Sequence, residues 1–241
     1  IIARNPENNF KHLDNLFKKI QDDTDIIILP ETFTTGFPAE PELFAEDENG
    51  PTMTWLREKA KEKNCAICGS FITAFGLQST VYGLQTPSNS QILKFHNTFV
   101  WMNPDGSYQT YDKRHTFMGG EKEQLCTGEN LITINYKGWR IRPFVCYDLR
   151  FPVWLRNSYK DGEFGYDLAI LIANWPMQKS HIWNTLLSAR AIENQAYFVG
   201  VNRVGIDHNN IPYIGETKVV DGKGRTLVEL KGDKEDVLEV D

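Results

Sequence analysis

The sequence predicts a mixed α/β fold, of the α/β or α+β class, in which helices cover β-sheets in a sandwich. Two short runs of consecutive apolar residues, at 25–29 and 168–173, are typical of strands buried on both faces. Segments with helical spacing alternate with strands early in the chain, and turn sequences separate closely spaced strands in the middle. No linker, repeat or low-complexity stretch divides the chain, so we predict a single domain over residues 1–241.

The first part of the chain is predicted to form a helix, a buried strand and a second helix. The first helix covers residues 6–20, with Asn5 as its N-cap and Pro6 in its first turn. Its apolar face consists of Phe10, Leu13, Phe17 and Ile20. The strand at 25–29 ends at Pro30, and the second helix covers residues 51–63. The inward residues of this second helix are Met53, Leu56 and Ala60.

The middle of the chain is richer in strands. Strands are predicted at 65–72, 97–102, 107–111, 131–136 and 139–145. A helix is predicted to begin near Pro152. After the buried strand at 168–173, another helix is capped by Ser180 and runs to about Asn194. A strand at 197–201 and a hairpin with its turn near 221–224 complete the order.

Composition and charge exclude several classes of function. The chain has 26 basic and 32 acidic residues, and its net charge of −6 gives no bulk attraction for nucleic acid or an anionic membrane. No apolar run approaches the roughly 20 residues of a membrane helix, and no leader pattern is expected. The first residue is not Met, so the sequence is expected to begin inside the gene product. Four cysteines are few for a secreted disulfide scaffold, so we expect free thiols and a cytoplasmic protein.

Three polar residues directly follow predicted strands, which is where ligand sites of α/β sheets lie. Cys146 ends a strand just before a helix, where backbone N–H groups can bind an oxyanion and a thiol pKa can be lowered. Glu31 is a candidate general base, and Lys113 a candidate for stabilising negative charge. Taken singly, each also has a structural explanation: a buried thiol, a strand-end cap and a solvated charge run.

Other patterns favour structure over chemistry. Cys65 and Cys68 form a C-x-x-C, but residues three apart in a strand face opposite sides, so core thiols are favoured over a redox pair or a zinc site. A Cys–His pair of His115 with Cys146 would leave the segments around Glu31 and Lys113 unexplained. No glycine-rich phosphate-binding motif is present, so nucleotide cofactors have no support.

Together, the segments around Glu31, Lys113 and Cys146 resemble the nitrilase, or carbon–nitrogen hydrolase, superfamily over nearly the whole chain. Further matching stretches are 104–106, 173–176, 189–194 and 200–203. The resemblance implies a four-layer α-β-β-α sandwich in which Glu31 is the general base, Lys113 the oxyanion stabiliser and Cys146 the nucleophile. It also implies that Glu121 positions the substrate or the triad. Family members usually have a strand before the first helix, and here only two residues remain for it, so either this strand is omitted from the sequence or the sheet edge is altered.

The residues after Cys146 resemble the omega-amidases most, because Tyr147-Asp148 stands where nitrile-cleaving members usually have Trp-Glu. This resemblance implies hydrolysis of the terminal amide of a small 2-oxo acid amide through a cysteine thioester, with release of ammonia and without a metal or organic cofactor. We expect Tyr147, with Phe37, Trp175 and Arg114, to position the substrate. The sequence does not decide whether Arg114 or Arg150 pairs with a substrate carboxylate.

Two alternatives and an assembly also follow from the resemblance. An N-carbamoyl amino acid amidohydrolase, or another amidase of the superfamily, would use the same residues, and a binding module of the same fold would keep them without catalysis. Family members commonly associate through the helix after the nucleophile and the helix carrying residues 189–193. We therefore expect a homodimer or larger assembly, with a twofold interface that includes Trp154, Ile182 and Leu186.

Overall fold

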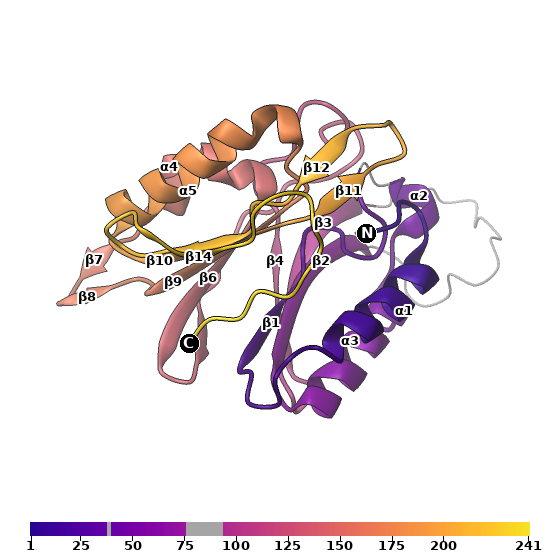
Figure 1. The fold of residues 1–241 in the computed structure, drawn as a ribbon, viewed down its shortest axis with the longest axis horizontal. Helices are drawn as coiled ribbons and strands as arrows, with labels where there is room; N and C mark the ends of the chain where they lie inside the picture. Colours follow the sequence, from indigo (N-terminus) through magenta and orange to yellow (C-terminus); the bar gives the residue numbers. More distant parts are fainter. Residues whose placement is uncertain (38–39, 76–93) are drawn as a thin grey trace.

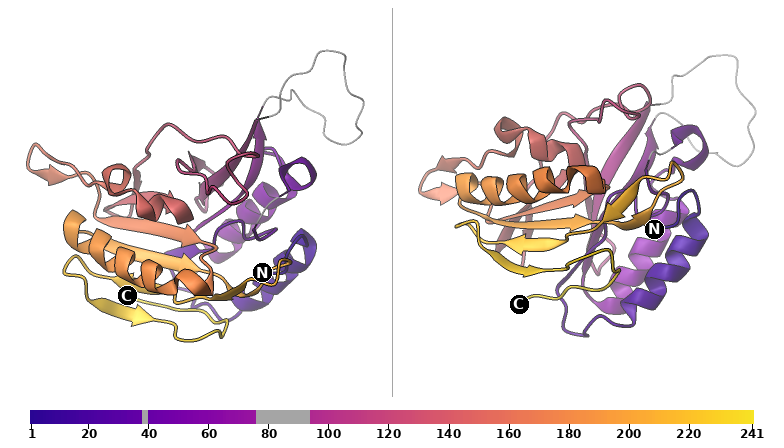
Figure 2. Two further views of the ribbon diagram at one scale, coloured as in Figure 1. Left: turned by 90° about the horizontal axis from the view of Figure 1, so that it is seen from above. Right: turned by 45° about the horizontal axis from the view of Figure 1, so that its top comes forward.

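Two β-sheets lie face to face between two layers of helices (Figure 1). The computed structural model describes residues 1–37, 40–75 and 94–241. Helices α1 (Pro6–Phe17) and α3 (Pro51–Lys63) cover the outer face of one sheet, and α5 (Ser180–Asn194) covers the outer face of the other (Figure 2). The expected four-layer sandwich is therefore confirmed.

The long helices begin and end close to the predicted residues. The side chain of Asn5 accepts a hydrogen bond from the Asn8 amide at 3.2 Å at the start of α1, which ends at Phe17 rather than Ile20. Helix α3 ends at Lys63, and its C-cap Asn64 has a left-handed φ of 50°. Helix α5 has Lys179 rather than Ser180 as its N-cap. The remaining helices are short: α2 (Pro41–Phe44), η1 (Cys146–Arg150), α4 (Pro152–Leu155) and η2 (Met177–Lys179).

The first sheet has four strands in the order β1-β2-β3-β4. These strands are β1 (Ile26–Ile28), β2 (Ala66–Phe75), β3 (Lys94–Met102) and β4 (Tyr108–Asp112). β1 pairs with β2 in parallel, and β3 is antiparallel to both β2 and β4. β4 therefore runs in the same direction as β1, and the two strands end at the same edge of the sheet. β1 is the edge strand on its side, and the first two residues of the chain form no strand.

The second sheet has six strands in the order β14-β13-β10-β9-β6-β5. They are β5 (Ile134–Tyr136), β6 (Trp139–Val145), β9 (Leu168–Ala173), β10 (Tyr197–Asn202), β13 (Lys218–Val220) and β14 (Thr226–Glu229). The three central strands β6, β9 and β10 are parallel, so their carboxyl ends lie together. β13 and β14 form the predicted C-terminal hairpin.

Two small hairpins lie outside the main sheets. Strands β7 (Tyr159–Lys160) and β8 (Glu163–Phe164) form one hairpin, and β11 (Val204–Ile206) and β12 (Pro212–Ile214) form the other. The sequence pattern predicts neither of them, because their strands are only two or three residues long. The β11–β12 hairpin follows the carboxyl end of β10, so it lies at the end of the sheet where ligand sites are expected.

Burial follows the four layers. One cluster joins α1 and α3 to the first sheet and includes the predicted inward residues Met53, Leu56 and Ala60. A second cluster joins α5 to the second sheet. A third cluster fills the space between the sheets with residues from both: Ala66, Cys68, Phe99, Trp101, Tyr111, Ile134, Ile141, Val145, Ile170 and Ile172. Because continuous apolar runs place side chains on both faces, β1 and β9 each pack against a helix layer and the facing sheet.

The segment after β14 returns to the first helix layer. Glu239 accepts hydrogen bonds from the backbone amide and side chain of Gln21 at 2.9 and 2.7 Å, and Lys19 pairs with Asp236 at 3.1 Å. In the parts of the chain that the structure describes, no helix is long and apolar enough to cross a membrane.

Candidate active site

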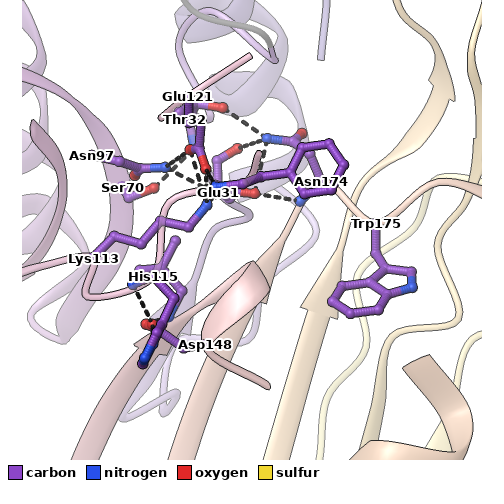
Figure 3. Close-up of polar contacts among 12 residues, drawn as sticks. Glu31, Thr32, Ser70, Asn97, Lys113, His115, Glu121, Asp148, Asn174 and Trp175 are labelled. Atoms are coloured by element: carbon purple, nitrogen blue, oxygen red, sulfur yellow. Dashed lines mark hydrogen bonds and ion pairs between the residues drawn. The ribbon is translucent and has the colours of Figure 1, made fainter. Parts of the chain in front are cut away.

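The candidate site lies where strands of both sheets end (Figure 3). Glu31 comes shortly after β1, Lys113 directly after β4, and Cys146 directly after β6. Glu121 comes from the loop that follows Lys113. The four residues line one cavity, although Glu31 and Cys146 are far apart in the sequence. The structure thus brings together the residues that the sequence analysis placed in the triad and the second carboxylate.

The ammonium of Lys113 is buried between two carboxylates (Figure 3). Its Nζ donates to Glu31 Oε1 at 2.9 Å and to Glu121 Oε1 and Oε2 at 2.9 and 2.7 Å. Burial acts to lower the pKa of Lys113, but the charges of Glu121 and Glu31 outweigh it and raise the pKa well above its ordinary value. Lys113 therefore carries a fixed positive charge at the floor of the cavity.

Two asparagines hold the Glu31 carboxylate in one orientation. The side chain of Asn97, in β3, donates to Glu31 Oε1 at 2.9 Å and to Glu121 Oε1 at 3.2 Å. The backbone amide of Asn174, directly after β9, donates to Glu31 Oε2 at 2.7 Å, and its side chain donates to the same oxygen at 3.3 Å. Glu31 is buried, so these bonds replace the water that would otherwise solvate its charge.

Cys146 is the first residue of η1 and has a φ of 46°, a left-handed conformation that residues other than glycine seldom adopt. This sharp turn at the end of β6 places the residue on the wall of the cavity, beside Glu31 and Lys113. Burial raises the pKa of the thiol, the carboxylate of Glu31 raises it further, and Lys113 partly opposes them. The lowered thiol pKa that the strand-to-helix junction indicated is therefore not present. The raised pKa favours the thiol form of Cys146, which lies beside the Glu31 carboxylate.

Asp148 ties the turn after β6 to the strand and loop that carry Lys113. Its Oδ2 accepts hydrogen bonds from the hydroxyl of Tyr111 at 2.7 Å and the amide of Val145 at 3.0 Å. Its Oδ1 accepts from the amide of His115 at 2.9 Å and contacts the ring Nδ1 at 2.8 Å. His115 is therefore engaged with Asp148, and the alternative Cys–His pair is not formed.

The cavity that the triad and Glu121 line has a volume of about 280 Å³, just below the roughly 300–1,000 Å³ typical of ligand sites. Phe37, Tyr147 and Trp175, which we predicted to contact the substrate, all line it. Trp175 makes no polar contact with the cluster drawn in Figure 3 and contributes an aromatic part of the cavity wall. The volume and the mixed polar and aromatic lining fit a small ligand.

Arg114 does not line this cavity, so its predicted contact with the substrate is not supported. Its Nη1 donates to the carbonyl of Gly128 at 2.9 Å, and its guanidinium lies 5.3 Å from the ring of Trp154. Lys113 and Arg114 both follow the end of β4, and only Lys113 lines the cavity.

Several residues of the site were not predicted from the sequence. Asn174 carries the same signal as Glu31, a polar residue directly after a buried strand, and was open to prediction. Asn97 lies inside β3 and gave no such signal. The β11–β12 hairpin, whose strands are too short to predict, contributes Asp207, Asn209, Ile211 and Tyr213 to the cavity.

The two cysteines of the C-x-x-C pattern lie in different layers, as expected for residues three apart in an extended segment. Cys65 packs in the cluster beneath α1 and α3, and Cys68 packs between the two sheets. Burial raises the pKa of Cys65 to about 11. All four cysteines are free thiols, and no group of His, Cys, Asp and Glu among the described residues is arranged to hold a metal ion.

Comparison with known proteins agrees with this geometry. Residues 2–241 match the family model described as carbon–nitrogen hydrolase. The chain is 42% identical over 217 residues to the omega-amidase YafV of Yersinia enterocolitica. The alignment covers 90% of this chain and 76% of that protein. It is 28% identical over 227 residues to the 2-oxoglutaramate amidase of Bacillus subtilis strain 168, covering 93% and 80%.

A solved structure shows the same relationship. The crystal structure of XC1258 from Xanthomonas campestris, described as a CN-hydrolase superfamily protein with an arsenic adduct in the active site, aligns with a TM-score of 0.86 and 38% identity. The alignment covers 97% of this chain and 84% of that one. The chain thus belongs to the carbon–nitrogen hydrolase family, and the enzyme class expected from its sequence is confirmed: it is a hydrolase of carbon–nitrogen bonds.

Proposed function

We propose that this protein is an amidase of the omega-amidase type, which hydrolyses the terminal amide of a small 2-oxo acid amide through a thioester on Cys146. The observation that carries the proposal is the contact of one buried ammonium, Lys113, with the two carboxylates of Glu31 and Glu121 beside that cysteine. The relatives named omega-amidase YafV and 2-oxoglutaramate amidase support the choice of substrate class.

In the first half of the reaction, the Cys146 thiol gives its proton to Glu31, and the sulfur attacks the amide carbonyl carbon. The negative charge that develops on the carbonyl oxygen is stabilised by Lys113 and by the backbone N–H of Tyr147. This N–H belongs to the first turn of η1, where amides lack partners within the helix. The C–N bond then breaks, and Glu31 returns its proton to the leaving nitrogen, which departs as ammonia.

In the second half, Glu31 takes a proton from a water molecule, whose oxygen attacks the thioester carbonyl. Lys113 again stabilises the oxyanion, the C–S bond breaks, and the proton returns to the sulfur of Cys146. Glu31 thus serves as base and acid twice in each cycle. Glu121 holds Lys113 in place, since it accepts two hydrogen bonds from the ammonium at 2.7 and 2.9 Å.

The test is ammonia release from a panel of small compounds. The panel contains 2-oxoglutaramate, glutamine, N-carbamoyl-β-alanine, an aliphatic nitrile and a simple aliphatic amide. We expect 2-oxoglutaramate to be hydrolysed with the highest kcat/KM, and added hydroxylamine to divert its thioester to a hydroxamate. Cys146→Ala should abolish ammonia release and leave the circular dichroism spectrum unchanged.

Each other outcome of the panel points to a different function. Preference for N-carbamoyl-β-alanine would place the protein among the carbamoyl amidohydrolases with the same three residues in use. Preference for the nitrile would contradict the amidase assignment. Ammonia release by Cys146→Ala at the wild-type rate would exclude the thioester mechanism, and silence with every compound would favour a binding module.

We further propose that residues 1–241 act as one domain, that the protein is cytoplasmic and that it assembles as a homodimer or larger oligomer. Trp154, Ile182 and Leu186 pack partly against the core of their own chain, which weakens their expected role in an interface. Val153 on α4 and Ile192 on α5 are 82% and 53% exposed, so they are better placed to contact a second copy. Sedimentation as a stable 27.7 kDa species at micromolar concentration would contradict the oligomer.

A further inference from the structure

We propose that Asn97 is a positioning residue that holds the carboxylates of Glu31 and Glu121 while Lys113 turns one N–H group to the carbonyl oxygen of the substrate. This inference rests on the proposed function and adds one residue to its machinery. Asn97 lies in β3, the strand between β2 and β4, and its side chain is buried behind the cavity, which it does not line. It therefore acts on the substrate only through its charged neighbours.

Every N–H group of the Lys113 ammonium is engaged by a carboxylate. An ammonium has three N–H donors, and Lys113 makes three hydrogen bonds, one to Glu31 Oε1 and two to the oxygens of Glu121. The proposed reaction needs one of these donors at the carbonyl oxygen, where negative charge develops. Lys113 must therefore release one carboxylate oxygen in each turnover.

Asn97 donates to the same carboxylate oxygens as Lys113 (Figure 3). Its side-chain amide has two N–H groups, which reach Glu31 Oε1 at 2.9 Å and Glu121 Oε1 at 3.2 Å. The third oxygen that Lys113 contacts, Glu121 Oε2, also accepts from the backbone amide of Phe117 at 2.7 Å. Each of the three oxygens thus keeps a donor after Lys113 has released it, so the buried negative charge stays hydrogen-bonded.

The two carboxylates also decide the orientation of the Asn97 amide. The opposite orientation would bring the amide oxygen against the negative charge of Glu31 and Glu121. In the present orientation Oδ1 is buried, and it has no hydrogen-bond partner in the part of the chain that the structure describes. A buried acceptor without a donor costs stability, which a leucine of the same branched shape would avoid. The polar residue is therefore explained by the donors that it offers to the two carboxylates.

The backbone fixes Asn97 relative to Lys113, because the Lys113 amide donates to the Asn97 carbonyl at 2.9 Å. The next residue of β3, Thr98, points to the other face of the strand. Its hydroxyl lies 2.6 Å from the hydroxyl of Thr73 and 2.6 Å from the carboxylate of Asp112. Thr98 is thus a buried, hydrogen-bonded neighbour outside the ionic cluster, and it provides a matched control.

The first test compares kcat and KM for 2-oxoglutaramate in wild type and variants. Asn97→Leu keeps the branched shape and removes both donors, so we expect kcat to fall about 10- to 100-fold and KM to change less than about 3-fold. Asn97→Ala, which cannot clash with its neighbours, should show the same split. Thr98→Val removes buried hydrogen bonds of the same strand, so it should lower thermal stability but change kcat less than about 2-fold.

The second test measures binding and needs no hydrolysis. Succinic semialdehyde adds to Cys146: the S–C bond forms, the thiol proton passes to Glu31, and the carbonyl electron pair stays on the oxygen as negative charge. Succinate has the same carbon chain and forms no bond to the sulfur. We expect Asn97→Leu to weaken binding of the aldehyde about 10- to 100-fold and binding of succinate less than about 3-fold.

The two tests separate this inference from the proposed function. An unchanged kcat, an equal loss of affinity for both ligands, or the same kinetic split in Thr98→Val would overturn the role of Asn97. Failure of wild type to form the aldehyde adduct would also overturn it. Lack of ammonia release by wild type, together with selectively weaker aldehyde binding in Asn97→Leu, would refute only the proposed function.

Discussion

The replacement Lys113→Met tests whether the ionic cluster supports both folding and catalysis. Lys113 is 1% exposed, and its ammonium lies 2.7–2.9 Å from oxygens of Glu31 and Glu121. At an effective dielectric constant of about 20, two unit charges about 3 Å apart interact by roughly 5–6 kcal/mol. Desolvation offsets much of this attraction, and the removal of one partner from a buried ion pair costs about 3–5 kcal/mol. We therefore expect Lys113→Met to lower the free energy of unfolding by about 3–5 kcal/mol.

Urea unfolding followed by circular dichroism measures this change. The control is Lys137→Met, which removes an exposed ion pair with Asp25 and should cost less than about 1 kcal/mol. Adding Glu121→Gln to Lys113→Met should recover part of the lost stability, since only one buried carboxylate then lacks a cation. Loss of the oxyanion donor should also lower kcat about 10²- to 10³-fold. A loss of stability below about 1 kcal/mol, or no recovery in the double variant, would refute the reasoning.

Three further predictions concern the thiols and the strand end. Burial raises the pKa of Cys65 from 9.0 to about 11, so its thiol ionises at lower pH in the unfolded chain than in the folded protein, and the free energy of unfolding falls between pH 9 and 11. Cys65→Ala should make this fall less steep, by up to about 1.4 kcal/mol per pH unit. An unchanged slope would contradict this prediction. The charge of Glu31 raises the thiol pKa of Cys146, and the charge of Lys113 lowers it. In the pH profile of Cys146 alkylation by iodoacetamide, Glu31→Gln should therefore move the midpoint to lower pH, and Lys113→Met should move it to higher pH. Shifts of both variants in the same direction would exclude this electrostatic account. A Cβ at Gly128 would lie 2.1 Å from a backbone oxygen at the end of β4, so Gly128→Ala should lower both thermal stability and kcat. Wild-type values of both would show that the chain can accommodate a side chain at this position.

The order of helices and strands could be predicted from local sequence, because the pattern of apolar residues in each segment indicates its secondary structure. The run at 168–173 is apolar throughout, and β9 has the predicted bounds. Helix α3 begins and ends where Pro51 and Lys63 indicated. The β11–β12 hairpin was missed since three-residue strands contain less than two periods of alternation, and it is this hairpin that closes one wall of the cavity.

The candidate site was predictable only in part. Glu31, Lys113 and Cys146 each directly or closely follow a strand, and their motifs in order resemble one family, which suffices to name them. The motifs did not show whether the side chain of a residue near a catalytic position points into the cavity or away from it. Arg114 and Arg150 therefore looked alike as partners for a carboxylate, and only one of them lines the cavity.

The sequence alone determined the class of fold and the order of its elements, because apolar periodicity is a local property, and the resemblance of its motifs to one family named the three residues proposed to catalyse. Only the tertiary structure decided their partners and the direction in which the thiol pKa is shifted. The pKa of Cys146 depends on burial and on Glu31 and Lys113, which follow strands of the other sheet. Coulomb energy and desolvation depend on distance in space, and the distances between these groups exist only once the two sheets have packed together.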